Sequence, residues 1–215
     1  MKYGFLQKVF WTVFKGTFKK ELTGVLKEND PKAVMKAAHK EYKVILSGVD
    51  EFDKDDRFLF NILSAAMFSA ILKHLKRKPT LEEARLYYRT AMNNNYFVRK
   101  MSKGTEEFTE KGRAKIKADA EKSMKCNNPY SWKFTVEDGE TINQYTTKFY
   151  TCGICHLLTQ QGLKEYIPAM CTYDYDMAAM NNTTFTREYT LAGGGEYCDC
   201  HYDHKSKGHK NGEVA

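Results

Sequence analysis

Long apolar runs are missing from this sequence of 215 residues. Because about 18 consecutive apolar residues are needed to span a bilayer, we expect no membrane span. The first residues are rich in aromatic side chains, but Lys8 and Lys15 interrupt them, so they lack the unbroken apolar core of a signal peptide. We therefore expect a cytoplasmic protein whose 6 cysteines are reduced thiols, metal ligands or catalytic groups rather than disulfides.

The chain also lacks any recognised nucleic-acid-binding motif, although its net charge is +7. Its lysines are scattered over helical segments, and residues 205–215 are basic and polar, as in a disordered tail. We expect no nucleic-acid partner. The charge fits a small anionic substrate better than a cation.

Hydrophobic periodicity predicts that the first half of the chain is helical. Residues 2–20 form an amphipathic pattern that fits a helix docked on the core, on a second subunit in a homodimer, or on a membrane surface. Asp30 before Pro31 predicts the start of a second helix. Residues 54–76 are the most hydrophobic segment and are expected to form the central core helix, and Thr80 with Glu83 predicts a capping box.

The second half alternates strand and helix patterns. Residues 93–112 are predicted to be a loop, and a lysine-rich helix follows to residue 125. Strands are expected on both sides of Asp138-Gly139 and on both sides of Gly193 to Gly195, with a helical insert between the two pairs. The prediction is an α+β fold with a helical N-terminal half followed by about four antiparallel strands. We divide it into a helical extension (1–50), a main domain (51–204) and the tail (205–215).

Five of the six cysteines lie between Tyr150 and Tyr202, which makes this stretch the candidate site. Helices are predicted over 152–161 and 166–180, and the helix dipole would favour a thiolate at Cys152. In the strands, alternation places Arg187 beside apolar neighbours, where a guanidinium needs an anionic partner. Cys171 and Asp174 are three residues apart on one predicted helix and should lie on one face.

Three chemical interpretations fit this stretch. The first is hydrolysis, in which Cys155, Cys171 and Asp174 act as nucleophile or proton carriers. The second is a zinc site formed by Cys152, Cys155, Cys198 and Cys200, with His156 or His201 as substitutes. The third is a ligand-binding or sensing module without catalysis. A single cysteine is more often a small buried apolar group than a catalytic one.

The order of the motifs resembles the L-2-amino-thiazoline-4-carboxylic acid hydrolase family. The motifs that carry this resemblance are P-A-M-C-T-Y-D, R-x-x-T-L-x-G-G and C-D-x-x-Y. The resemblance is strongest from Cys152 to Tyr202 and extends back to about residue 55. Cys200 departs from it, since an aromatic residue is expected there, and residues 1–50 carry none of the signature.

The resemblance implies water-driven opening of a thiazoline ring to an N-carbamoyl-cysteine-type product, without a cofactor. Arg187 would bind the substrate carboxylate, Asp174 would hold the amidine or relay a proton, and Cys155 or Cys171 would attack the ring or hydrogen-bond the leaving sulfur. Thr190 and Gly194 complete the expected substrate-binding set, with backbone amides near the glycines steadying developing charge.

Overall fold

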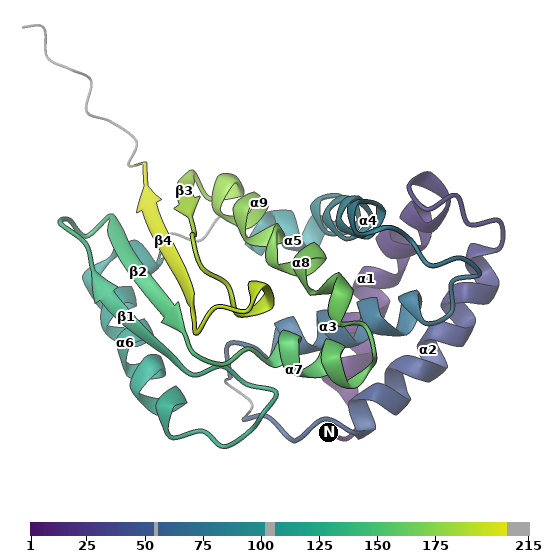
Figure 1. Ribbon diagram of the computed structural model, residues 1–215, viewed down its shortest axis with the longest axis horizontal. Coiled ribbons are helices and arrows are strands. Elements are labelled where there is room, and N and C mark those ends of the chain that lie inside the picture. The colour runs from purple at the N-terminus through teal and green to yellow at the C-terminus, as the bar shows by residue number, and fades with distance from the viewer. Residues whose placement is uncertain (54–55, 102–105, 206–215) are drawn as a thin grey trace, which may run out of the picture.

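The computed structural model describes residues 1–53, 56–101 and 106–205 and has an α+β fold (Figure 1). The α-helices are α1 (Phe5–Gly24), α2 (Pro31–Ser47), α3 (Leu59–Leu72), α4 (Leu81–Asn93), α5 (Tyr96–Met101), α6 (Glu110–Met124), α7 (Gly153–Gln160), α8 (Ile167–Cys171) and α9 (Tyr173–Met180). The strands are β1 (Phe134–Asp138), β2 (Gln144–Phe149), β3 (Thr183–Thr186) and β4 (Cys198–His204), and short 3-10 helices span Glu106–Phe108, Lys164–Tyr166 and Leu191–Gly193. Residues 206–215 of the expected tail lie outside the described residues.

The largest apolar core lies within the helical half of the molecule. Helix α3 is its centre, as predicted, because nearly every one of its side chains is buried. The side chains of Phe10, Phe14 and Phe18 of α1 are buried in the same core. This burial favours a helix docked on the core over a helix that lies on a membrane surface. Helices α1 and α2 share this core with α3 and α4. The domain boundary expected at residue 50 stays a prediction. No helix in the described part of the chain has the length and apolarity to cross a bilayer.

The predicted helix starts form for the expected local reasons. The Asp30 side chain accepts a hydrogen bond from the Ala33 amide at the start of α2, and Thr80 with Glu83 forms the capping box of α4. The loop predicted over 93–112 is wrong in part, because α5 forms within it. The Asn95 side chain accepts hydrogen bonds from the amides of Phe97 and Val98 in the first turn of α5.

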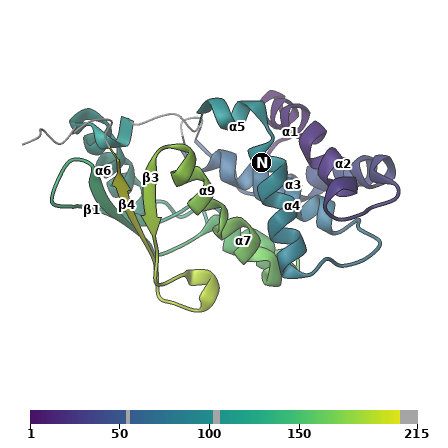
Figure 2. The same ribbon diagram turned by 90° about the horizontal axis from the view of Figure 1, so that it is seen from above.

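The sheet is antiparallel throughout, in the order β1-β2-β4-β3 (Figure 1). Its register pairs Tyr145 with Tyr202, and Tyr202 with Phe185, so these rings lie on one face. Helix α6 packs on this face over β1, and Ala178 of α9 packs on it over β3 and β4. Viewed from above, α9 lies between the sheet and the helical half (Figure 2).

Two predicted elements around the candidate site differ from the structure. The helix expected over 166–180 is divided into α8 and α9 at Thr172, whose hydroxyl donates to the Pro168 carbonyl. The last two strands do pair, but β3 ends at Thr186 and a long connection precedes β4. The glycines form a 3-10 turn within this connection, where Gly194 has a φ of +89°.

Candidate functional site

A cavity of about 760 Å³ opens where the sheet, α6 and the helical half meet. Tyr145 and Tyr202 line it from the sheet, and Asp174 lines it from α9. Most of the remaining wall is aromatic or aliphatic, with Phe58, Phe60, Tyr88, Met92, Phe97, Phe108, Ile116, Ile154, Met170, Tyr173 and Met177 among its side chains. Charged and polar side chains also line it, namely Arg57, Asn61, Glu106, Glu107, Lys115, Asp119, Asn181 and Thr183. A cavity that combines an apolar wall with polar groups is the usual form of a small-molecule site.

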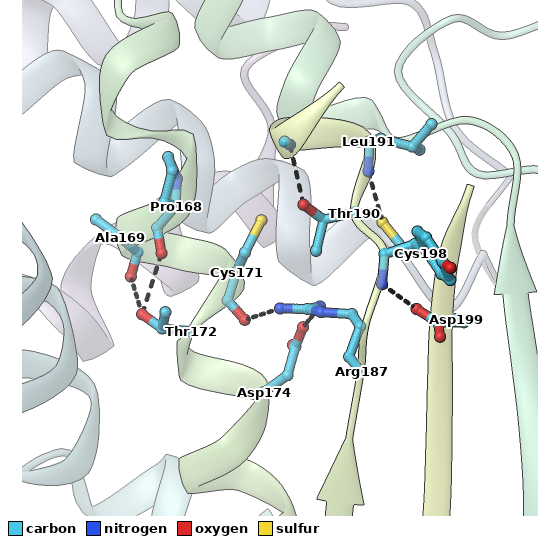
Figure 3. A network of polar contacts seen from close by, with 12 residues as sticks. Pro168, Ala169, Cys171, Thr172, Asp174, Arg187, Thr190, Leu191, Cys198 and Asp199 are labelled. Carbon is cyan, nitrogen blue, oxygen red and sulfur yellow. Dashed lines mark hydrogen bonds and ion pairs between the residues drawn. The ribbon is translucent and has the colours of Figure 1, made fainter. Parts of the chain in front are cut away.

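Asp174 is held in this wall by Arg187, which follows β3. Nη1 of Arg187 donates to Oδ2 of Asp174 at 2.9 Å, and Nη2 donates to the Cys171 carbonyl at 3.0 Å (Figure 3). The side chain of Arg187 is only 6% exposed, whereas that of Asp174 is 48% exposed. The guanidinium therefore lies behind the carboxylate, and the carboxylate reaches the cavity. The pair joins two of the predicted site residues and also supplies the anionic partner expected for Arg187.

Two opposing effects set the charge on this pair. Burial in the protein raises the pKa of Asp174, while the charge and hydrogen bond of Arg187 offset part of that rise. Burial alone would lower the pKa of Arg187, but the Asp174 carboxylate raises it, so the guanidinium stays charged. A carboxyl with a raised pKa, in contact with a fixed cation, is suited to hold a cationic group or accept a proton.

Asp199 fixes the backbone that carries Arg187. Its carboxylate accepts hydrogen bonds from the amides of Glu188 at 3.1 Å and Tyr189 at 2.6 Å, and the residue is 5% exposed. Burial alone would raise the pKa of Asp199, but these amide hydrogen bonds and one to His201 lower it below its ordinary value. No role for Asp199 was predicted from the sequence. The signal that was available is its position between Cys198 and Cys200, because alternation along a strand turns it to the opposite face from those two residues.

None of the cysteines is among the residues that line the cavity. All six cysteines are free, and Cys198 accepts a hydrogen bond at its sulfur from the Leu191 amide. Figure 3 shows the Cys171 sulfur pointing away from Asp174, while its carbonyl binds Arg187. Burial raises the pKa of Cys171 far above its ordinary value and that of Cys200 to about 12, so both stay protonated near neutral pH.

Cys152 stands at the N-cap of α7, as predicted, but its expected thiolate character is wrong. A hydrogen bond with Cys155, and then burial, raise the pKa of Cys152 well above its ordinary value. Backbone hydrogen bonds at the helix start act in the opposite direction and are outweighed. Cys152 and Cys155 therefore form a hydrogen-bonded thiol pair beneath the site rather than an activated nucleophile.

The remaining predicted groups lie in the connection between β3 and β4. Thr190 accepts a hydrogen bond from the Gly193 amide at 2.9 Å and so caps the 3-10 turn, and Gly194 closes it. Neither residue lines the cavity, and their substrate-binding role stays a prediction. Within the described ranges, no three His, Cys, Asp or Glu side chains are grouped so that they could hold a metal ion. The alternative zinc site at Cys152, Cys155, Cys198 and Cys200 thus finds no support in this geometry.

Comparison with known proteins gives one match. The family model for L-2-amino-thiazoline-4-carboxylic acid hydrolase matches residues 60–202, which include the Asp174 and Arg187 pair, the thiols, and all of the cavity lining except Arg57 and Phe58. No curated protein and no solved structure gave a significant match. Because the matched region is most of the chain and contains every predicted site residue, the chain belongs to the L-2-amino-thiazoline-4-carboxylic acid hydrolase family.

Proposed function

We propose that this protein is a hydrolase that opens a carboxylate-bearing thiazoline ring in the cavity beside Asp174. The observation that carries the proposal is the carboxylate of Asp174, which reaches the cavity while the buried Arg187 fixes it from behind. A 2-amino-thiazoline contains an amidine, and its cationic form pairs well with a carboxylate. The family supports this substrate class.

The reaction places specific demands on the residues around Asp174. Water adds to the amidine carbon, forming a carbon–oxygen bond, and the bond from that carbon to the ring sulfur then breaks. The sulfur leaves as a thiolate and takes up a proton, which gives an N-carbamoyl-cysteine product. Asp174 holds the amidine so that the carbon becomes more electrophilic, and it accepts a proton from the attacking water.

Arg187 positions Asp174 in this scheme. Its contacts with Asp174 and the Cys171 carbonyl hold the carboxylate in place, and because the guanidinium is buried behind Asp174 and does not line the cavity, the expected contact of Arg187 with the substrate carboxylate finds no support in this geometry. The Cys171 thiol is not the nucleophile in this proposal, because its raised pKa leaves almost no thiolate near neutral pH. Neither Cys155 nor Cys171 lines the cavity, so neither thiol contacts the reacting ring in this proposal.

Turnover of 2-amino-thiazoline-4-carboxylate tests the proposal, with release of a free thiol as the readout. Wild-type protein should open the ring, and Asp174→Asn should lower kcat at least about 100-fold, as expected for loss of a general base. Asp176→Asn is the matched control on the same helix, since Asp176 forms an ion pair with Arg89 instead. It should keep wild-type turnover.

The outcomes distinguish hydrolysis from ligand binding without catalysis. Equal turnover by wild type and Asp174→Asn would show that the carboxylate is not the reacting group. No turnover by wild type, combined with calorimetric binding that Asp174→Asn abolishes, would favour the ligand-binding module without catalysis.

A further inference from the structure

The cavity is much larger than the ring proposed to react in it, and this inference rests on that proposed function. Its volume of about 760 Å³ lies within the range of about 300 to 1,000 Å³ typical of sites for drug-sized ligands. A single five-membered ring with a carboxylate and an amino group is far smaller than such ligands. Binding of the ring at Asp174 would leave most of the cavity unfilled.

The unfilled part is bounded by aromatic rings from both sides. On the sheet, Tyr145 and Tyr202 are stacked, with centroids 4.7 Å apart and an angle of 16° between their planes. Phe108 lies beside them, with its centroid 5.5 Å from that of Tyr145. On the helical side, Phe60 and Phe97 also line the cavity. The faces of Tyr145 and Tyr202 stack on each other, and the Arg113 guanidinium lies 4.4 Å from the centroid of Tyr145. The rings therefore offer a ligand their edges, which favour edge-to-face contact with an aromatic group.

The charged groups that line the cavity lie on two elements. Asp174 is on α9, whereas Lys115 and Asp119 line the cavity from α6 and Glu106 and Glu107 from the 3-10 turn before it. Arg57 also lines the cavity and is paired with Glu107 and Asp119, so the acidic groups near α6 are partly neutralised. A ligand whose polar ring binds Asp174 would therefore direct a substituent along the tyrosines toward α6. Figure 1 shows α6 beside β1 and α9 beside β3, at opposite edges of the sheet.

We propose that the substrate is an extended thiazoline-type carboxylate, in which the reactive ring carries a bulky aromatic substituent that binds against Tyr145, Tyr202 and Phe108. Asp174 selects the amidine, and the aromatic wall selects the substituent. The free thiazoline is then a minimal substrate that uses only one end of the cavity.

Equilibrium binding by calorimetry tests the substituent separately from the chemistry. The probes are 2-amino-thiazoline-4-carboxylate and two analogues that carry a benzyl group, one on ring carbon 5 and one on the exocyclic nitrogen. At least one analogue should bind about 100-fold more tightly than the free ring, because a buried aromatic group removes about 150 Å² or more from water. Equal or weaker binding of both analogues would overturn the inference.

A cavity-filling variant locates the effect. Lys115→Trp places a large side chain in the α6 wall of the cavity. It should lower the benzyl preference, which is the ratio of the affinity for the benzyl analogue to the affinity for the free ring, at least about tenfold, while leaving the affinity for the free ring unchanged. Lys111→Trp is the matched control, since Lys111 is exposed on the same helix and does not line the cavity. A benzyl preference unaffected by Lys115→Trp would place the substituent elsewhere and overturn the inference. Turnover of each probe, measured in parallel, tests the proposed function alone, because the binding ratio does not depend on chemistry.

Discussion

Asp174→Asn should cost stability only while Arg187 is present. The substitution leaves the guanidinium of Arg187, which is 6% exposed, without a carboxylate partner. Complete loss of a partner in a buried ion pair costs about 3 to 5 kcal/mol. Here Asn still accepts one hydrogen bond, and Arg187 keeps its contacts with the rings of Phe185 at 5.4 Å and Tyr175 at 5.9 Å. We therefore expect a loss of about 2 kcal/mol in the free energy of unfolding.

The double-mutant cycle makes this reasoning refutable. In protein that already carries Arg187→Met, no buried cation remains, so Asp174→Asn should cost less than about 0.5 kcal/mol. Urea unfolding followed by circular dichroism gives all four free energies, and the coupling should be about 1.5 kcal/mol. Asp176→Asn serves as the control, because its partner Arg89 is 57% exposed and such pairs contribute little. If Asp174→Asn costs the same in both backgrounds, the pair is not the electrostatic unit described here.

Three further predictions concern the surroundings of the site. Asp199→Asn should lower the free energy of unfolding near neutral pH by about 2 kcal/mol. Because the pKa of Asp199 is lowered in the folded protein, its contribution to the free energy of unfolding is present above the ordinary aspartate pKa and is lost as the pH falls through the lowered value. Urea titrations should therefore show that the difference in stability between wild type and Asp199→Asn shrinks in acid. A difference that stays constant with pH would contradict this. Gly153→Ala should lower the free energy of unfolding by more than about 2 kcal/mol, since a Cβ there would lie 1.8 Å from the backbone oxygen of Tyr130. Gly16→Ala is the control and should stabilise α1, because a Cβ there would meet nothing within 4 Å. Equal melting temperatures of the two variants would argue against the close packing of α7 on Tyr130. The Cys200 thiol, with its pKa raised to about 12, should be alkylated in native protein at least about 100-fold more slowly than free cysteine, and rapid labelling in mass spectra would refute its burial.

Alternation along the strands predicted the surroundings of Arg187. It placed this side chain among apolar neighbours, and in the structure Arg187 is 6% exposed with its guanidinium 5.4 Å from the ring centroid of Phe185. The need of a buried guanidinium for an anion was also predicted, because that need is independent of the fold. Asp174 was not predicted to be that anion, since their pairing depends on how α9 packs against β3. Local capping signals at α2 and α4 were equally reliable.

Features that depend on distant contacts could not be predicted from local patterns. Residues 187–197 resemble a strand followed by a glycine turn, but Asp199 binds the amides of Glu188 and Tyr189 and ends β3 early. The division of the helix at Thr172 carries no glycine signal, and the proline at 168 lies within the first turn of α8. The cavity is formed by elements far apart in the sequence, so neither its size nor its aromatic wall could be predicted.

The position of a bound ring analogue tests the central claim most directly. Crystals soaked with 2-amino-thiazole-4-carboxylate, an aromatic and unreactive relative of the proposed substrate, would place the ligand by electron density. The account predicts its amidine nitrogens within hydrogen-bond distance of the Asp174 carboxylate, inside the cavity. Density for the ligand over the thiols and Thr190, with Asp174 still paired only to Arg187, would contradict the account.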